Sequence, residues 1–319
     1  MTIVRRPLFL PLVIAALLSA CGGGGSGGGS SASAGSSTTA TGFDTTAYVG
    51  APASVGNVAT DGRNWINYRR GQLGVPPLTQ NPLIDRAAQN HSDYQRINDV
   101  IAHEEVSGKA GFTGVLLGDR LAMVGYTLTP NAYTYGEVIS ASTNGSGFFM
   151  AEELVTAIYH RFVMFEPIFK EMGTGSGTTS RNYTYFTADF VANSGYGPGI
   201  GRGKMVVWPV GGQVAVTPNF FSDQEEPDPV DNVNEVGYPV SVHADITSPV
   251  VVSSFTMRPR NGSNLAVKLM QHSTDILTPS SAAAIIPLNR LSAATVYDVS
   301  FSGSVGGVAV TRSWSFTTK

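Results

Sequence analysis

The sequence predicts a mixed α/β domain followed by an all-β domain, preceded by an N-terminal segment that lacks the composition of a folded unit. From about residue 56 to 195, helical spacing of apolar residues alternates with strand patterns. From residue 205 onward helix signals stop, and short β-branched runs separated by turn residues follow one another. A chain of 319 residues is long enough for two domains of ordinary size.

The first 20 residues have the order of a bacterial lipoprotein signal peptide. Arg5 and Arg6 form a short basic region, an apolar run follows from Leu8 to Leu18, and Cys21 comes after small residues. The run is shorter than the roughly 20 apolar residues of a membrane span. We expect Cys21 to be lipidated and to attach the protein to a membrane. A plain secretory signal is the alternative, and a single cysteine excludes an intrachain disulfide.

Residues 21–55 are expected to form a flexible tether. Gly22 to Gly29 contains seven glycines and one serine, and Ser, Thr, Ala and Gly dominate to about Thr41. Because Gly22 is not aspartate, we expect outer-membrane or cell-surface placement if the host is Gram-negative. The formal charge of −3, without a basic run, argues against nucleic acid as a partner.

The domain at residues 56–195 begins with two helices. Asp61 is placed to cap a first helix that carries Trp65 and Tyr68, and Asn81-Pro82 opens a second. Further elements are expected at Leu116–Met123 (helix), Ala151 to about Phe162 (helix) and Tyr183–Phe190 (strand).

The domain at residues 196–319 is predicted to be an immunoglobulin-like β-sandwich. Its short strands are separated by turn residues, and Gly306-Gly307 lies between two alternating runs, a hairpin signal. The segment from Leu291 to Thr318 resembles the end of bacterial immunoglobulin-like modules, which serve as spacers or adhesive units on envelope proteins.

A series of short motifs follows in order along the first domain. They are RRGQLGVPPL (69–78), NPL (81–83), AAQNHS (87–92), His103, DR (119–120) with GY (125–126), GEVI (136–139), YHR (159–161), PIF (167–169) with MGTG (172–175), and the strand 185–190. In this order they resemble the CAP superfamily, also called the SCP-like or cysteine-rich secretory, antigen 5 and pathogenesis-related group, in its bacterial form. The resemblance covers about residues 57–193.

The resemblance implies an α-β-α sandwich with a cleft that holds two histidines and one or two glutamates. His103 matches the first cleft histidine, Glu137 the motif glutamate and His160 the second histidine, and relatives bind a divalent cation, often zinc, through the histidines. Val138 departs from the family's asparagine, and Tyr159 from its glycine. The second glutamate is not placed. Glu153, seven residues before His160 on one helical face, is a candidate.

The chemistry of these residue types agrees with such a site. Two neutral imidazoles and a carboxylate would hold zinc with one position open for water. Without metal, Glu137 beside a histidine could act as a general base. The alternative is a polar cluster that only satisfies its own hydrogen bonds.

Other polar residues of this domain are expected to have structural roles. His91 lies on an apolar helical stripe, which favours a packed, hydrogen-bonded histidine, although it could also line the cleft with Tyr159. Of Glu104 and Glu105 at most one can face the site, and a solvated pair is expected. Asp119-Arg120 is expected to cap and anchor its helix, and Gly173–Gly177 to form a turn.

Three functions remain open from the sequence. The first is a binding module for a small-molecule, lipid, peptide or glycan ligand, with a divalent cation. The second is a metal-dependent hydrolase that acts on peptide or cell-wall substrate. The third is a non-catalytic adhesion or structural protein that uses its β domain. Val138 and the missing second glutamate favour binding over catalysis.

Overall fold

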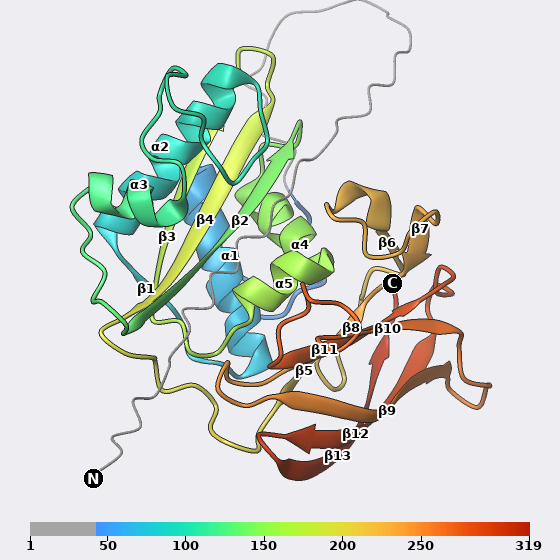
Figure 1. Cartoon of the computed structure of the whole chain (residues 1–319). Helices are drawn as coiled ribbons and strands as arrows, with labels where there is room; N and C mark the ends of the chain where they lie inside the picture. The colour runs from blue at the N-terminus through green and yellow to red at the C-terminus, as the bar shows by residue number, and fades with distance from the viewer. Residues whose placement is uncertain (1–42) are drawn as a thin grey trace, which may run out of the picture.

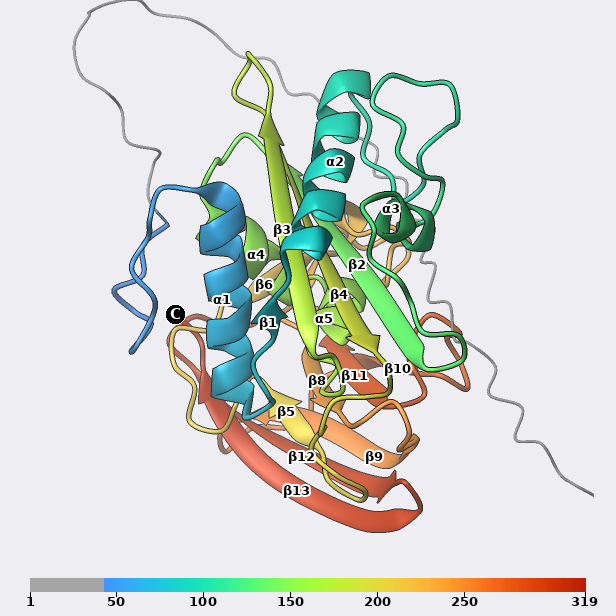
Figure 2. The ribbon, with the colours of Figure 1, turned by 90° about the vertical axis from the view of Figure 1, so that its left-hand side faces the viewer.

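The computed structural model describes residues 43–319 and shows a three-layer first domain joined to a β domain (Figure 1). The first domain contains α1 (Val58–Leu73), β1 (Thr79–Gln80), α2 (Pro82–Asn98), α3 (Leu117–Met123), β2 (Tyr133–Ser142), α4 (Gly147–Thr156), α5 (Ile158–Met164), β3 (Glu171–Thr178) and β4 (Thr184–Asn193). Its sheet has the order β1-β3-β4-β2. Helices α2 and α3 cover one face, and α1, α4 and α5 cover the other (Figure 2). The predicted α-β-α sandwich is confirmed.

Successive side chains along β4 point to opposite faces of the sheet. Phe186 points toward α1, where its ring lies against Gly62. Thr187, the next residue, points the other way, and its hydroxyl accepts hydrogen bonds from Ser92 and Gln95 of α2. Every second residue of β2 and β4 therefore faces α2.

The helix starts follow local capping chemistry. Asn81 caps α2 with Pro82 in the first turn, as predicted. The cap of α1 is Asn57, whose side chain accepts from the Thr60 amide, so the expectation that Asp61 is the cap was wrong. The carboxylate of Asp61 instead accepts from the backbone amides of Val55 and Gly56, and it fixes the chain that enters the helix.

The glycines at 173–177 lie in strand β3, so the predicted turn was wrong. A Cβ on Gly173 would lie 2.1 Å from the Asp85 amide nitrogen, and one on Gly175 would lie 2.2 Å from that of Gln89. The glycines are needed because the backbone of α2 packs directly onto this strand.

The predicted helix at 151–162 is two helices, α4 and α5. They meet at Ala157, whose φ of −68° and ψ of 122° are extended. Glu153 and His160 therefore do not share one helical face, and the spacing argument that linked them was wrong.

The second domain is built of antiparallel strands in small sheets. Its elements are β5 (Val206–Trp208), β6 (Asn219–Phe221), a 3-10 turn (Ser222–Gln224), β7 (Glu235–Gly237), β8 (Val240–His243), β9 (Val250–Pro259), β10 (Val267–Gln271), β11 (Ala282–Pro287), β12 (Val296–Val305) and β13 (Val308–Thr317). The sheet orders are β10-β11-β8-β5, β13-β12-β9 and β6-β7. Gly306-Gly307 joins β12 to β13, so the predicted hairpin is confirmed. The β module after the α/β domain is confirmed as well.

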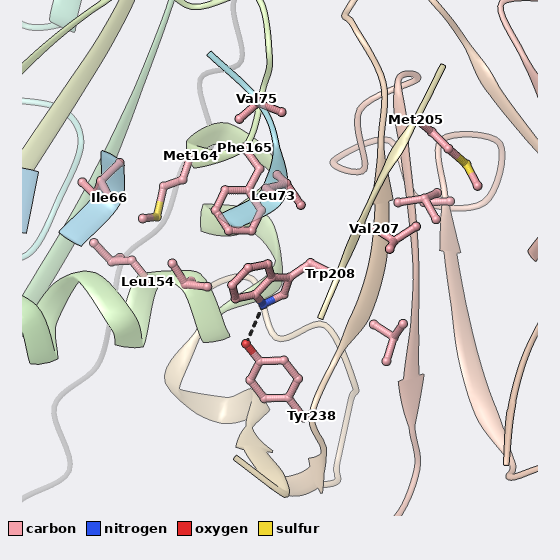
Figure 3. Close-up of a cluster of buried hydrophobic side chains, with 14 of the residues drawn as sticks. Ile66, Leu73, Val75, Leu154, Met164, Phe165, Met205, Val207, Trp208 and Tyr238 are labelled. Atoms are coloured by element: carbon pink, nitrogen blue, oxygen red, sulfur yellow. Dashed lines mark hydrogen bonds between the residues drawn. The ribbon is translucent and has the colours of Figure 1, made fainter. Parts of the chain in front are cut away.

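A continuous hydrophobic core joins the two domains (Figure 3). Trp208 of β5 is fully buried, packs edge-on against Phe165 at 5.1 Å between ring centroids, and donates a hydrogen bond to the hydroxyl of Tyr238. Leu154 of α4 belongs to the same cluster. Because Trp208 of the second domain packs against Phe165 of the first within one cluster, separating the domains would expose apolar surface that they share.

The start of the described chain packs onto the first domain. Phe43 and Tyr48 each lie 5.2 Å from Trp65 between ring centroids, and the Tyr68 hydroxyl donates to the Val49 carbonyl. The flexible tether expected at residues 21–55 therefore does not extend to residue 55, because aromatic packing holds the chain against the first domain from residue 43 onward. The predicted signal peptide and Cys21 lie outside the described residues. No helix within residues 43–319 combines the length and apolarity needed to cross a membrane.

Candidate functional site

Glu137 is the centre of a buried polar cluster between β2 and the loop that follows α2. It pairs with Asp189 of β4 in the sheet register, so both side chains face α2. One carboxylate oxygen lies 2.8 Å from Nδ1 of His103, and the other lies 2.6 Å from Nη2 of Arg120. Nε2 of His91 is 4.0 Å from the first oxygen. The structure thus brings together His103 and Glu137, as the resemblance implied.

Electrostatics keeps Glu137 ionised. Burial by itself would raise the pKa of this carboxyl, but the charge of Arg120, with His91 and His103, outweighs burial and lowers the pKa well below its usual range. Asp189 behaves in the opposite way. Burial, followed by the charge of Glu137 and a hydrogen bond to it, raises the pKa of Asp189 well above its usual range, and neither oxygen accepts a hydrogen bond from a donor among residues 43–319. The direction of this shift favours the protonated, neutral form of Asp189.

His91 is a buried, hydrogen-bonded histidine, as predicted. Its Nδ1 lies 2.9 Å from a carboxylate oxygen of Glu105, and its Nε2 lies 2.8 Å from the Ala102 carbonyl oxygen. Glu105 also accepts from the backbone amides of Thr113 and Gly114. Since both neighbours of the ring can only accept, both ring nitrogens donate and His91 is an imidazolium.

The two adjacent glutamates have different surroundings. Glu105 is buried, and its pKa is lowered because the hydrogen bonds from His91 and Thr113 outweigh the effect of burial. Glu104 is exposed. The expectation of a solvated pair was wrong for Glu105, because folding of the loop after α2 closes it around His91. The buried cluster is then neutral, with two cations (His91, Arg120) against two anions (Glu105, Glu137) and the neutral acid Asp189.

Arg120 is the functional residue that sequence reasoning missed. Asp119 does cap its helix, since it accepts from the Leu116 amide. Arg120, however, is fully buried and reaches Glu137, while its Nη1 donates to the His103 carbonyl oxygen at 2.8 Å. Helix α3 supplies this arginine 17 residues before its carboxylate partner, a separation at which no local pattern signals a pair.

His103 is the part of the cluster that solvent reaches. Its side chain is 17% exposed, against 5% for Glu137. Because ionised Glu137 can only accept, Nδ1 of His103 carries a hydrogen, and in the neutral ring Nε2 then has a lone pair. Nε2 has no hydrogen-bond partner among residues 43–319. The cluster therefore presents one oriented imidazole nitrogen that can accept a proton or a hydrogen bond.

His160 lies on the opposite side of the sheet. It belongs to α5, which lies on the side of the sheet away from α2 (Figure 1). Val163 of the same helix would meet a Cβ on Gly136 at 2.6 Å, whereas the adjacent Glu137 faces α2 by the alternation of β2. Nδ1 of His160 lies 2.9 Å from a carboxylate oxygen of Glu225, in the β domain. The same carboxylate accepts the backbone amides of Ile158, Tyr159 and His160.

Two further residues considered for the cleft lie apart from His103. The hydroxyl of Tyr159 donates to Asp275 of the β domain at 3.1 Å, so Tyr159 is an interdomain contact. Glu153 of α4 accepts from the Ser140 hydroxyl at 3.3 Å, and burial raises its pKa to about 7. Ser140 shares the sheet face of Gly136, so Glu153 approaches the sheet from the side opposite to His103.

These side chains do not fit a shared cation site in this arrangement. Among residues 43–319, no group of three or more His, Cys, Asp or Glu side chains is placed to hold a metal ion. Both oxygens of Glu137 already accept a bond, and His160 is bonded to Glu225.

Comparison with known proteins identifies the first domain. Residues 63–190 match the family model of CAP, the cysteine-rich secretory protein family. The first domain is therefore a CAP domain, and the sequence-based identification of this domain is confirmed. No curated protein matches the chain.

Two solved structures resemble parts of the chain. One is an extracellular protein containing an SCP domain from Bacillus anthracis str. Ames, with 20% identity, a TM-score of 0.36, and coverage of 43% of this chain and 40% of that chain. The other is an outer surface protein of Borrelia burgdorferi, with 13% identity, a TM-score of 0.35, and coverage of 41% and 89%. The chain thus spans two fifths of the length of the first.

Proposed function

We propose that this protein is a cell-envelope protein whose CAP domain binds a hydroxyl- or amide-bearing polymer, a cell-wall glycan or peptide, through His103. The observation that carries the proposal is the open Nε2 of His103, held in one tautomer by Glu137 at 2.8 Å. An unprotonated imidazole nitrogen accepts a hydrogen bond from a hydroxyl or an amide N–H. Attachment to the outer membrane or cell surface through lipidated Cys21 is part of the proposal and rests on the sequence.

The surroundings of His103 support binding by a preorganised group. Arg120 holds the backbone carbonyl of His103 with one nitrogen and the carboxylate that orients its ring with another. Ring and backbone are therefore fixed together, which reduces the entropy lost when a ligand binds.

The experiment is cosedimentation of the full chain, in detergent, with purified peptidoglycan sacculi. We expect the unmodified protein to pellet with the sacculi and the His103→Ala variant to stay in solution. His272→Ala, a change of an exposed histidine in the β domain, is the matched control and should pellet. Failure of the unmodified protein to pellet, or unchanged pelleting of His103→Ala, would contradict the proposal.

Acylation by diethyl pyrocarbonate tests the site itself without any ligand. Unprotonated, accessible imidazole nitrogens react, so His103 should be modified and the buried imidazolium His91 should not. Bound sacculi should protect His103. Modification of His91 in place of His103 would show that the tautomers and burial described above are wrong.

Hydrolysis without a metal is a second candidate, favoured by the same hydrogen bond. An imidazole oriented by a carboxylate is a general base, and its efficiency is greatest when its pKa lies near the working pH. Glu137, which the sequence offered as the base, is a poor one because its pKa is strongly lowered. Release of soluble fragments from sacculi by the unmodified protein, abolished in His103→Ala, would favour hydrolysis over binding alone.

A further inference from the structure

The positive charge beside Glu137 is supplied by the protein itself. Arg120 is fully buried, its Nη2 lies 2.6 Å from Glu137, and its Nη1 lies 2.8 Å from the His103 carbonyl oxygen. A guanidinium keeps its charge at any physiological pH and binds carboxylate and carbonyl groups in a fixed, planar geometry. The position of this charge is therefore permanent.

A bound cation would have two effects at this carboxylate. It would balance the negative charge of Glu137, and it would hold a histidine ring in place beside it. Arg120 already balances the charge, and the Glu137–His103 hydrogen bond already holds the ring. A second cation would have to displace Arg120 or lie against it, and like charges repel strongly in a buried site.

The second histidine of the family's pair is engaged elsewhere. One carboxylate, that of Glu225, accepts four hydrogen bonds from the start of α5: three from backbone amides and one from Nδ1 of His160. Glu225 is itself buried. Bringing His160 toward His103 would break these bonds and leave a buried carboxylate without partners, which is costly.

We propose that Arg120 takes the place of the divalent cation in this CAP domain, and that His160 serves as a docking contact for the C-terminal domain. The His103 site is then assembled without metal. This inference does not depend on which ligand binds His103, and it is tested without one.

The first experiment measures zinc uptake. The full chain in detergent is stripped with a chelator and titrated with zinc, beside the His103→Ala, His160→Ala double variant. We expect equal uptake by the two proteins, because any zinc held elsewhere in the chain is common to both. One additional equivalent bound by the unmodified protein would overturn the proposal.

The second experiment asks whether Arg120 orders the site. In the unmodified protein, the ¹⁵N spectrum of His103 should show the Nδ1–H tautomer, unchanged by chelator or zinc. Arg120→Met should lose this tautomer preference and Arg120→Lys should keep part of it, while Arg86→Met, a change of an exposed arginine on α2, should have no effect. A zinc-dependent shift of His103 in the unmodified protein would overturn the proposal, even if Arg120→Met fails to fold.

Discussion

Two buried carboxyls face each other across β2 and β4, and they should respond very differently to replacement by their amides. Glu137 is ionised and paired with the fully buried Arg120 at 2.6 Å. Asp189 is fully buried, accepts no hydrogen bond within the described part of the chain, and has a raised pKa that favours its neutral form. Glu137→Gln and Asp189→Asn both remove one titratable acid and preserve side-chain size.

The expected magnitudes follow from the charges left behind. Glu137→Gln removes the anion that balances Arg120, and breaking a buried ion pair costs about 3–5 kcal/mol because a charge stays uncompensated. Asp189→Asn replaces one neutral group by another of the same shape and should change the free energy of unfolding by about 1 kcal/mol or less. The difference between the variants is the quantity of interest, since it cancels much of the common cost of changing a packed residue.

The assay is equilibrium unfolding in urea at pH 7, followed by tryptophan fluorescence of the full chain in detergent. Trp65 and Trp208 are buried in the core shared by the two domains, so both report its loss. We expect the midpoint of Glu137→Gln to fall by several times the change seen for Asp189→Asn. Equal losses, or a larger loss for Asp189→Asn, would refute the assignment of the charge to Glu137 and of the proton to Asp189.

Four further predictions concern a buried glutamate at the domain interface, a glycine of the sheet, a glycine of α1 and the pH dependence of stability. Glu225→Ala should lower the free energy of unfolding by about 3 kcal/mol because four donors lose their acceptor, whereas the adjacent, exposed Glu226→Ala should change it by about 0.5 kcal/mol or less in urea titrations. Gly175→Ala should cost about 3 kcal/mol or more, since its Cβ would lie 2.2 Å from the α2 backbone. Gly71→Ala, on the open side of α1, should raise the free energy of unfolding by about 0.5–1 kcal/mol, which is measured as a higher melting temperature. Burial raises the pKa of Glu166 to about 8, so its contribution to stability is complete below its unfolded pKa of about 4.3 and is lost as pH rises through 8. Melting temperatures between pH 6 and 9 should therefore fall less in Glu166→Gln than in the unmodified protein, and parallel curves would contradict this.

Because the two domains share a core, deleting the β domain does not test its role in adhesion. Trp208 and Tyr238 of the β domain pack with Phe165 of the CAP domain, and Glu225 caps α5. Deletion of residues 205–319 would expose this apolar surface and unfold part of the CAP domain. Adhesion by the β domain is better tested by substitutions on its exposed strands, with the core left intact.

Local chemistry determined much of this protein's fold. Asn81-Pro82 predicted the start of α2, and the apolar stripe on that helix placed His91 inside. Gly306-Gly307 predicted the last hairpin. Each of these features depends on residues within a few positions of one another, where backbone preference and side-chain periodicity act directly. The turn predicted at Gly173 and Gly175 was wrong for the opposite reason. These glycines allow α2, which is distant in sequence, to pack directly against strand β3.

The site depended on tertiary structure. The sequence supplied His103, Glu137 and His160, but the sheet places His160 on the other face, and a carboxylate 65 residues away engages it. Arg120 reaches Glu137 only because α3 packs beside β2. The pKa of Asp189 is raised because folding buries it and because the register sets it opposite Glu137. Charge state and pairing at such a site follow from distance and burial, and these are properties of the folded chain rather than of any local segment.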